Sequence, residues 1–358
     1  RWPNRHVVPW RFNPHNGGPV TRALGAAMAT GRLTVCANAV AREIMTDPAS
    51  GRATGVCYAD RATGAVRVAH ARAVVVCASP IESVRLLLNS RSRLHPDGLA
   101  NSSGTLGQYF MDQCPSLMFG RWPATCREGG DGTLPVHPLF GTTGGLYIPR
   151  YENACGAHDP AFMRGYTFQG SIGRHAAHGK DVPVAIMGFG EMLPYRTNAI
   201  TLDPRRRDRW GIPLPHIRCA LHANERAMLR KQIRDCADMI ETGGGHVDFW
   251  ASPLGLGEGD AGLYPDKPFP IRWFIRKMFP KSMTMGAAIH ESGGARMGND
   301  PATSVLNPFC QAWDVPNMFG TDASSFPTGG ALGTTLTVMA VSMRACHHLA
   351  EELRAGRL

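Results

Sequence analysis

The sequence has no long uninterrupted hydrophobic run. A membrane-spanning helix needs about 18 consecutive apolar residues, whereas the longest candidates, such as Ala73–Ala78, have the length of buried strands. Charged residues make up only 18% of the 358 residues, below the roughly 25% of typical domains. The hydrophobic fraction of 43% is too high for an intrinsically disordered chain. The composition predicts a globular protein without a membrane span, long enough for two domains or one large one.

Motifs of several well-known enzyme classes are also missing. The ten cysteines include no C-x-x-C pair, which argues against a zinc ribbon and a thioredoxin-like redox site. There is no Walker A sequence, no G-x-S-x-G elbow and no H-E-x-x-H. P-loop nucleotide hydrolysis, α/β-hydrolase chemistry and zinc-protease chemistry are therefore disfavoured.

Acidic residues are fewer than basic ones, and the formal net charge is +10. Such an excess suits an anionic partner, which could be a nucleic acid, a membrane surface or an anionic cofactor. The basic residues are scattered along the chain, and the densest run, Arg205–Arg209, is short. Aromatic residues are not interleaved with the basic runs, as they are on single-strand binding surfaces. A basic nucleic-acid-binding module is therefore a disfavoured alternative, and we expect no nucleic-acid partner.

The first third of the chain reads as strands followed by a helix. Extended, valine-rich segments are expected at 32–44, 55–60 and 66–78. Ser79 then precedes Pro80 and Glu82, which is the pattern of a capping box with proline at the first helical position. A buried strand that runs into a capped helix is typical of the βα step in a doubly wound nucleotide-binding sheet.

The pattern changes to short alternating segments with many prolines between about residues 115 and 285, which favours an antiparallel sheet. The segment 225–242 reads as an amphipathic helix. From residue 290 an α/β pattern returns, with a strand at 317–321 and a terminal helix at 335–353. We therefore predict an α/β and α+β fold with three parts: an incomplete Rossmann-like nucleotide-binding domain at 1–114, an inserted antiparallel-sheet substrate domain at 115–289, and a return to the first domain at 290–358.

The segment Gly257–Gly262 matches G-x-G-x-x-G, the phosphate-binding pattern of dinucleotide-binding folds. That pattern works only when a helix follows it, because the N-terminus of the helix faces the phosphates. Here no apolar strand leads into the motif, and Pro265 and Pro268 follow where the helix should run. We interpret the segment as a loop.

The most specific pattern lies from residue 290 onward. It begins with H-E-S-G-G-A-R-M-G-N-D-P over residues 290–301 and continues with the segments 303–307, 314–319, 321–328 and 335–340. Their order and spacing resemble the C-terminal signature of the glucose–methanol–choline (GMC) flavin oxidoreductases, and the nearest variant is the gluconate dehydrogenase-like, sugar-oxidising group. Three earlier stretches resemble other blocks of the same family: 73–90, 98–112 and 190–213.

The resemblance implies an FAD-dependent enzyme that oxidises an alcohol, in this group a sugar or polyol. Such a reaction removes a hydroxyl proton and a hydride from the same carbon. The resemblance places the proton acceptor at His290, a residue type that titrates near neutral pH, while the flavin accepts the hydride. It also implies an electron acceptor for the reduced cofactor, either oxygen, an acceptor protein or a quinone.

The resemblance further implies which residues contact the cofactor. Val40 matches the family strand that meets the adenine, and Ala78 lies in the strand-to-helix step near the nucleotide. Asp322 and Ala323 match the position beside the ribityl and phosphate groups. Thr334 and Thr335 open the terminal helix, whose positive dipole end would stabilise negative charge on the reduced flavin. The predicted cofactor contacts are therefore Val40, Ala78, Asp322, Ala323, Thr334 and Thr335.

The sequence departs from the family pattern at several points. Gly333 stands where the family has His or Asn as the second hydrogen-bonding residue of the active site. Thr334 replaces a proline, Ser79 replaces a glycine, and Gln113 stands where His commonly follows Met-Asp. The family's opening strand and G-x-G-x-x-G helix do not occur in this sequence. We expect a truncated GMC-type enzyme, and the alternative is a catalytically impaired fragment or a non-catalytic relative that keeps the fold.

Overall fold

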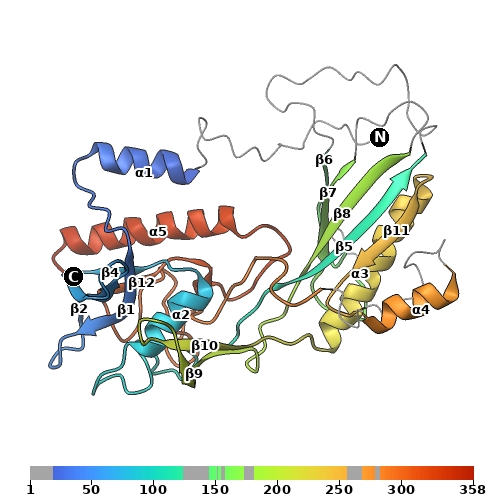
Figure 1. Cartoon of the computed structure of the whole chain (residues 1–358). Coiled ribbons are helices and arrows are strands. Elements are labelled where there is room, and N and C mark those ends of the chain that lie inside the picture. The colour runs from blue at the N-terminus through green and yellow to red at the C-terminus, as the bar shows by residue number, and fades with distance from the viewer. Residues whose placement is uncertain are drawn as a thin grey trace.

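The computed structural model describes residues 19–123, 145–150, 152–154, 158–172, 181–255, 268–278 and 283–358. These residues form two lobes that lie side by side (Figure 1). One lobe contains α1, α2 and α5 with small sheets, and the other is built around a five-stranded sheet. The glycine motif at 257–262 lies outside the described residues.

The first lobe combines a small antiparallel sheet with a parallel strand pair. The antiparallel sheet contains, in spatial order, β1 (Ala39–Thr46), β2 (Ala53–Asp60) and β3 (Val66–His70). The parallel pair consists of β4 (Val74–Val76) and β12 (Met318–Gly320). The helices of this lobe are α1 (Pro19–Ala29), α2 (Pro80–Asn89) and α5 (Thr335–Arg354). The strand and terminal helix predicted at 317–321 and 335–353 are confirmed.

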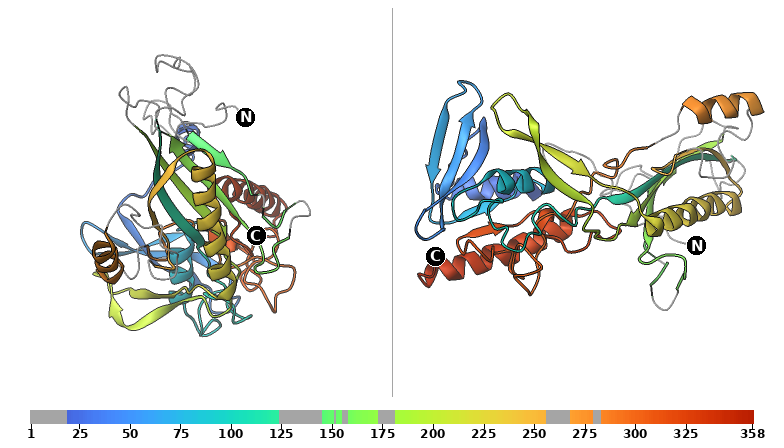
Figure 2. Two further views of the ribbon diagram at one scale, coloured as in Figure 1. Left: turned by 90° about the vertical axis from the view of Figure 1, so that its right-hand side faces the viewer. Right: turned by 90° about the horizontal axis from the view of Figure 1, so that it is seen from below.

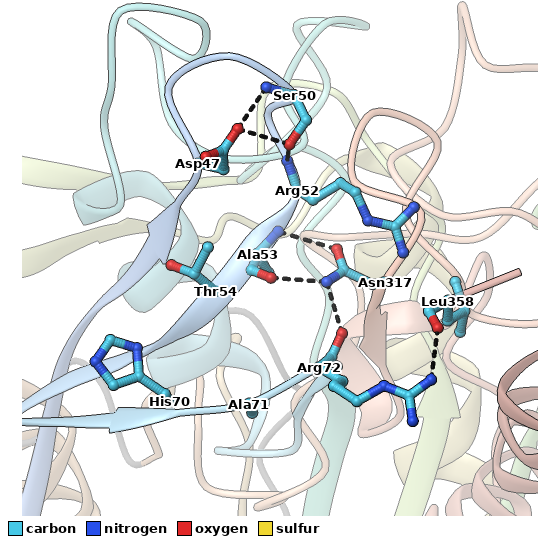
Figure 3. A pocket seen from close by; sticks show the side chains of 10 residues that line it. All are labelled: Asp47, Ser50, Arg52, Ala53, Thr54, His70, Ala71, Arg72, Asn317 and Leu358. Carbon is cyan, nitrogen blue, oxygen red and sulfur yellow. Dashed lines mark hydrogen bonds between the residues drawn. The ribbon is translucent and has the colours of Figure 1, made fainter. Parts of the chain in front are cut away.

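The single strand predicted at 66–78 is wrong, because this segment forms β3 and β4 in two different sheets. The amide side chain of Asn317 holds the break between them. Its Nδ2 donates to the carbonyls of Arg72 and Ala53 at 2.8 and 2.7 Å, and its Oδ1 accepts from the Ala53 N–H at 2.9 Å (Figure 3). The strand predicted at 32–44 is also displaced, since β1 begins only at Ala39.

The predicted capping box at the start of α2 is wrong as well. Pro80 does occupy the start of the helix, but the Ser79 side chain makes no capping hydrogen bond. The reason lies in the backbone, since Ser79 has φ 73° and ψ 153°. This region of conformational space is almost restricted to glycine, which explains why glycine suits this position in the family pattern.

The second lobe has an antiparallel sheet, as the alternating sequence pattern predicts. Its strands lie in the order β11 (His246–Ala251), β5 (Gln113–Trp122), β8 (Val182–Glu191), β7 (Tyr166–Ile172) and β6 (Gly145–Ile148). Helix α3 (Ala223–Thr242) lies along one face of this sheet (Figure 2). The helix begins two residues before the predicted start, and the Glu225 carboxylate accepts from the His222 N–H at 3.0 Å. The structure therefore places a second hydrophobic core between α3 and the sheet.

Strand register gives the two faces of this sheet different roles. Gln113 lies opposite Glu191 and Thr167 lies opposite Phe189, so alternation places all four side chains on the same face. The intervening residues face α3: a Cβ added to Gly190 would lie only 2.6 Å from the Met228 Cε. One face is therefore packed by the helix, and the other is available to the segments that form the candidate site.

A two-stranded ribbon packs against the first lobe through close backbone contacts. Gly107 donates to the Gly294 carbonyl at 2.6 Å and accepts from the Ile200 N–H at 2.7 Å. Ile200 belongs to β9 (Ala199–Arg207), which pairs with β10 (Pro213–Arg218). The guanidinium of Arg85 in α2 donates to the Pro213 carbonyl at 2.7 Å and binds the Asp208 carboxylate at 2.8 Å. This ribbon is thereby fixed against the first lobe.

Two short helices complete the structure, η2 (Ala323–Ser325) and α4 (Phe269–Met278). In the part of the chain that the structure describes, every helix is too short or too polar to cross a membrane.

Candidate active site

The candidate site lies where three distant parts of the chain meet. Met111 and Ser292 exchange backbone hydrogen bonds, both of 2.8 Å, so the segment before β5 runs beside the segment that follows His290. Gly293 donates to the Ala323 carbonyl at 2.9 Å, which joins the same segment to η2. His290 and the predicted contacts at 322–323 are therefore brought into one region by main-chain pairing.

The backbone around His290 is fixed by the buried carboxylate of Asp112. Its Oδ1 accepts from the His290 N–H at 3.3 Å and its Oδ2 accepts from the Gly286 N–H at 2.9 Å. Ile289, immediately before, has a left-handed φ of 58° and a side chain that is 78% exposed. The sharp turn leaves Ile289 in solvent and His290 half-buried.

The imidazole ring of His290 has one nitrogen bonded within the protein. Its Nδ1 lies 2.6 Å from the Oε1 of Gln113, the first residue of β5. The ring of Phe189, on the same sheet face, has its centroid 5.4 Å from that of the imidazole. No hydrogen bond from the described residues involves Nε2. The ring is therefore held on one side and available for a proton on the other.

Gly333 lies next to that available nitrogen. A Cβ built on Gly333 would be 3.8 Å from the His290 Nε2, an ordinary van der Waals distance. Gly333 directly precedes Thr334, the N-cap of α5, whose side chain makes no capping hydrogen bond. The first N–H groups of a helix have no intrahelical partner, and this end carries the positive side of the helix dipole. His290 Nε2 thus lies near a helix end that favours negative charge.

Burial lowers the pKa of His290 below its ordinary value of 6.5, because the charged imidazolium loses hydration there. The carboxylates of Asp112 and Glu291 act in the opposite direction without reversing the effect. Burial also raises the pKa of Asp112 itself. The imidazole is therefore neutral at pH 7, which is the protonation state that a general base needs.

The predicted nucleotide contacts gather at the carboxyl ends of the parallel strands. The Thr321 N–H, just after β12, donates to the Val76 carbonyl at the end of β4, at 3.0 Å. Ser83 in α2 joins the two strand ends: its Oγ accepts from the Ala78 N–H at 2.9 Å and donates to the Asp322 Oδ2. This edge is the position where nucleotides bind in α/β sheets.

Val40 stands apart from this group. It lies in β1, where it pairs with Ala59 in the three-stranded sheet and not at the β4–β12 edge. A surface hollow on the same lobe, drawn in Figure 3, holds none of the predicted site residues and includes the chain end at Leu358. The predicted active site therefore lies outside that hollow.

Sequence reasoning assigned no role to three residues that organise the site, Ser83, Asp112 and Gln113. Nothing in the sequence marks Ser83, because a serine in the first turn of a helix is common. Gln113 is visible as a departure from the family pattern, and its position directly after Asp112 is the signal that could have drawn attention to it. Its contact with His290 depends on tertiary structure that no local pattern encodes.

Comparison with known proteins places these features in a family. One model of the GMC oxidoreductase family matches residues 15–113 and a second matches residues 194–342. The chain belongs to the GMC oxidoreductase family. Members of this family are FAD-dependent oxidoreductases.

Curated relatives of this GMC oxidoreductase include three dehydrogenases. The 2-methyl-1,2-propanediol dehydrogenase of Mycolicibacterium austroafricanum is 34% identical, over 92% of this chain and 55% of its own length. The fructose dehydrogenase large subunit of Gluconobacter japonicus is 26% identical, over 89% and 54%. The gluconate 2-dehydrogenase flavoprotein of Pantoea cypripedii is 27% identical, over 84% and 48%. The chain spans about half the length of the curated relatives that it matches.

Solved structures of the family have the same fold. A formate oxidase of Aspergillus oryzae superposes with a TM-score of 0.60 at 16% identity, covering 88% of this chain and 60% of its own. A pyridoxine 4-oxidase from Mesorbium loti superposes with a TM-score of 0.53 at 16% identity, covering 87% of this chain and 57% of its own. These similarities bear out the predicted α/β flavin-binding fold.

The residues at the site fit a flavin nucleotide. The backbone after β4 is exposed at Cys77 and Ala78, as is the start of α5 at Thr335 and Leu336. The Oγ of Ser292 is buried without a hydrogen-bond partner and faces the 329 region, where a Cβ on Gly329 would lie 3.3 Å from it. The uncapped end of α5 suits a flavin ring, which carries negative charge when it is reduced, and the exposed end of β4 suits the nucleotide portion.

Proposed function

We propose that this GMC oxidoreductase oxidises the CH–OH group of a sugar or polyol, with FAD as its cofactor and His290 as the base. The observation that carries this proposal is the position of the His290 Nε2. It has no partner among the described residues and lies beside Gly333 at the N-terminus of α5, while Nδ1 is held by Gln113. Ala78, Asp322 and Ala323 would hold the nucleotide and ribityl portions, and Thr334 and Thr335 would lie near the ring.

The proton chemistry follows from these positions. When bound, FAD supplies the hydride acceptor that turns the carbinol carbon into a carbonyl carbon. His290 removes the hydroxyl proton at Nε2 and becomes an imidazolium. The Asp112 carboxylate, which fixes the backbone of His290, also makes that positive charge less costly. An electron acceptor, either oxygen, an acceptor protein or a quinone, would complete the cycle.

The substrate class rests on the names of relatives. Those names include a propanediol, fructose, gluconate and C-glycosides, all of which carry secondary or primary alcohol groups. A sugar or polyol is the class that these substrates share. Residues 115–289 would form the substrate-facing part, as the sequence predicts.

The test is anaerobic flavin reduction in the flavin-loaded protein. His290→Ala should slow reduction by sugars and polyols at least a hundredfold, because general-base catalysis contributes about 10²–10⁴-fold. His347→Ala, on an exposed position of α5, is the matched control and should reduce as fast as the parent. A His290→Ala protein that is as fast as the parent would show that the base is another residue.

The alternative, a catalytically impaired relative, is favoured by one observation: Gly333 offers no side-chain donor beside His290. Gly333→Asn would restore a donor, and one positioned donor is worth about 10²–10³ in rate. The backbone at 333 is not left-handed and an added Cβ has ordinary space, so the change should be tolerated. Gly333→Ala is the control for volume. A parent that binds FAD but is reduced only after Gly333→Asn would identify the impaired relative.

A further inference from the structure

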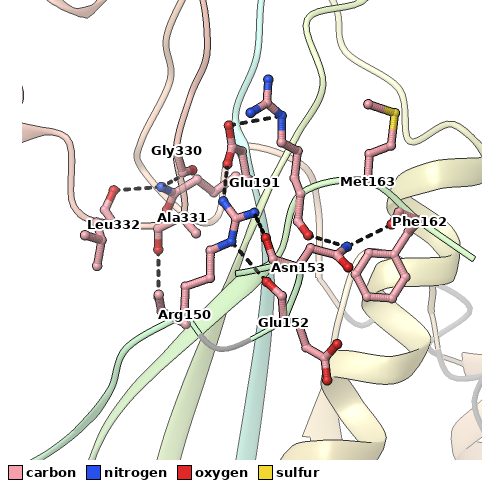
Figure 4. Close-up of polar contacts among 12 residues, drawn as sticks. Arg150, Glu152, Asn153, Phe162, Met163, Glu191, Gly330, Ala331 and Leu332 are labelled. Carbon is pink, nitrogen blue, oxygen red and sulfur yellow. Dashed lines mark hydrogen bonds and ion pairs between the residues drawn. The ribbon is translucent and has the colours of Figure 1, made fainter. Parts of the chain in front are cut away.

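Gln113 connects the candidate base to the loop on the other side of the site. It is the first residue of β5, and its side chain is completely buried. Its Oε1 lies 2.6 Å from the His290 Nδ1, and its Nε2 lies 2.9 and 2.7 Å from the carbonyl oxygens of Gly330 and Leu332. Figure 4 shows the two carbonyls directed toward the same donor.

These contacts determine which way the amide of Gln113 points. A carbonyl oxygen only accepts hydrogen bonds, so the group that faces Gly330 and Leu332 must be the NH₂ group. The amide oxygen must then face His290. The orientation therefore follows from hydrogen-bond chemistry, which is the basis on which amide oxygen and nitrogen are assigned.

The orientation of the amide in turn determines the tautomer of the histidine. Because Oε1 is an acceptor, the Nδ1 of His290 must donate to it and must carry the proton of the neutral ring. The unshared electron pair then lies on Nε2, the nitrogen beside Gly333. A free histidine side chain prefers the opposite arrangement, with the proton on Nε2.

We propose that Gln113 is a positioning residue that holds His290 in its Nδ1–H tautomer and so presents a basic Nε2 to the substrate. The inference rests on the proposed function for its catalytic meaning. The tautomer itself is a property of the chain and does not depend on activity.

The surroundings of the ring explain why an amide suits this position. Phe189 covers the ring, and the charged groups facing it are the carboxylates of Asp112 and Glu291. A further carboxylate at Gln113 would favour the imidazolium and move the protonation of His290 toward neutral pH. A neutral acceptor orients the ring without that electrostatic effect.

The Gln113 side chain also holds the loop that precedes α5. Gly330 and Leu332 lie just before Gly333 and α5, and Thr167 holds the carbonyl between them, that of Ala331, at 2.6 Å. One amide therefore fixes both the base and the loop that leads to the helix end.

The decisive experiment is nitrogen NMR of the chain labelled with ¹⁵N-histidine, recorded above the pKa of His290. Long-range proton–nitrogen spectra distinguish a protonated Nδ1 from a protonated Nε2, and the His290→Gln variant assigns the signal. We expect the Nδ1–H form in the parent protein. An Nε2–H form in the parent would overturn the proposal, whatever the variants show.

Two substitutions separate orientation from structure. Gln113→Met removes the acceptor at similar length, and the Nε2–H tautomer should become the major form. Gln113→Glu keeps an acceptor toward Nδ1 but loses the two donors toward Gly330 and Leu332, so its folding is checked first. In the folded variant the Nδ1–H form should persist while the proton affinity of His290 rises tenfold or more. Gln169 is an exposed residue of β7 in the same sheet. Gln169→Glu introduces the same charge and should change neither the tautomer nor the proton affinity of His290. A Gln113→Met spectrum with the tautomer and pKa of the parent would refute the role of Gln113.

Kinetics of the flavin-loaded protein give an independent readout. In Gln113→Glu the acid limb of the pH–rate profile should move upward by at least one unit, a change that mere loosening of the fold would not produce. If the parent reduces no flavin with any alcohol, the proposed function fails and the tautomer assignment stands. If the parent is active but carries the Nε2–H form, the positioning role fails and the proposed function stands.

Discussion

Ser79 occupies a backbone conformation that is almost restricted to glycine, at the point where β4 turns into α2. Its φ of 73° and ψ of 153° cost on the order of 1–3 kcal/mol for a residue with a Cβ, and its hydroxyl caps nothing. The carbonyl of Ser79 still accepts from the Ser83 N–H at 2.8 Å. The strain is therefore held in place by the helix that follows.

Ser79→Gly should raise the free energy of unfolding by about 1 kcal/mol or more, since the strain disappears while some unfolded-chain entropy is gained. Urea denaturation measures the change. Ser79→Ala is the control, because it keeps the Cβ and loses only the hydroxyl, and it should leave the stability of the parent unchanged. Equal stabilisation by both variants would show that the hydroxyl, and not the backbone, is responsible.

The lowered pKa of His290 predicts where activity is lost on acidification. Protonation inactivates the base, so the acid limb of flavin reduction should have its midpoint below 6.5, the ordinary histidine value. Asp112→Asn should lower the midpoint further, because the Asp112 carboxylate raises the pKa of His290. The same shift has a stability consequence: the unfolded chain binds this proton more readily, so stability is lost as the pH falls from 6.5 through the folded pKa. A parent midpoint above 6.5 would contradict the prediction.

At the scale of elements, the breaks between strands depend on side chains that are distant in sequence. Asn317 lies before β12, yet its amide makes three hydrogen bonds to the backbone at Ala53 and Arg72. The valine-rich segment 66–78 carries no local signal for a break, and continuous strand is what its residues favour. The strand at 317–321 and the terminal helix were predictable because their hydrophobic periodicity is local.

Asn317→Asp tests these three hydrogen bonds with almost no change in the shape of the side chain. The substitution removes two donors and places a carboxylate opposite two carbonyls in a buried position. Leaving the buried Ala53 carbonyl unsatisfied costs about 1–3 kcal/mol, so a loss of about 2 kcal/mol in unfolding free energy is expected from denaturant titration. Asn299→Asp, at an exposed position, should stay within about 0.5 kcal/mol of the parent. An Asn317→Asp protein as stable as the Asn299→Asp control would contradict the role given to Asn317.

The candidate site was only partly predictable for the same reason. The family pattern indicated His290, Gly333 and Asp322 as separate points along the chain. Their arrangement depends on the pairing of Met111 with Ser292 and of Gly293 with Ala323, which has no local sequence signature. The buried amide of Gln113 could be noticed only as a departure, because its partners lie some two hundred residues away.

At the scale of the whole molecule, the net charge of +10 comes from basic residues that are scattered along the chain, and the densest basic run, Arg205–Arg209, is short. Any association with single-stranded DNA should therefore be weak and fall steeply between about 50 and 200 mM salt, as counterion release requires. Fluorescence anisotropy at several salt concentrations measures this. Replacing Arg205 and Arg206 by glutamine should change the affinity little at physiological salt. Tight binding that persists at physiological salt would instead favour the basic-module alternative.

The predicted division at residues 114/115 and 289/290 stays a prediction, but the contacts show how closely the lobes are joined. The loop at 330–332 is followed by α5 of the first lobe, while its carbonyls are held by Gln113 and Thr167 of the second. Residues of both lobes therefore meet around His290. Neither lobe alone contains every residue of the proposed site.

Strand register, finally, limits where this chain can change in length. Gln113, Phe189 and Thr167 share one sheet face only because β5, β8 and β7 keep their present pairing. Insertion or deletion of a single residue within one of these strands would turn its site residue toward α3, and would bring side chains against the helix where Gly188 and Gly190 now leave room. We therefore expect insertions and deletions to be tolerated only in the connections between these strands.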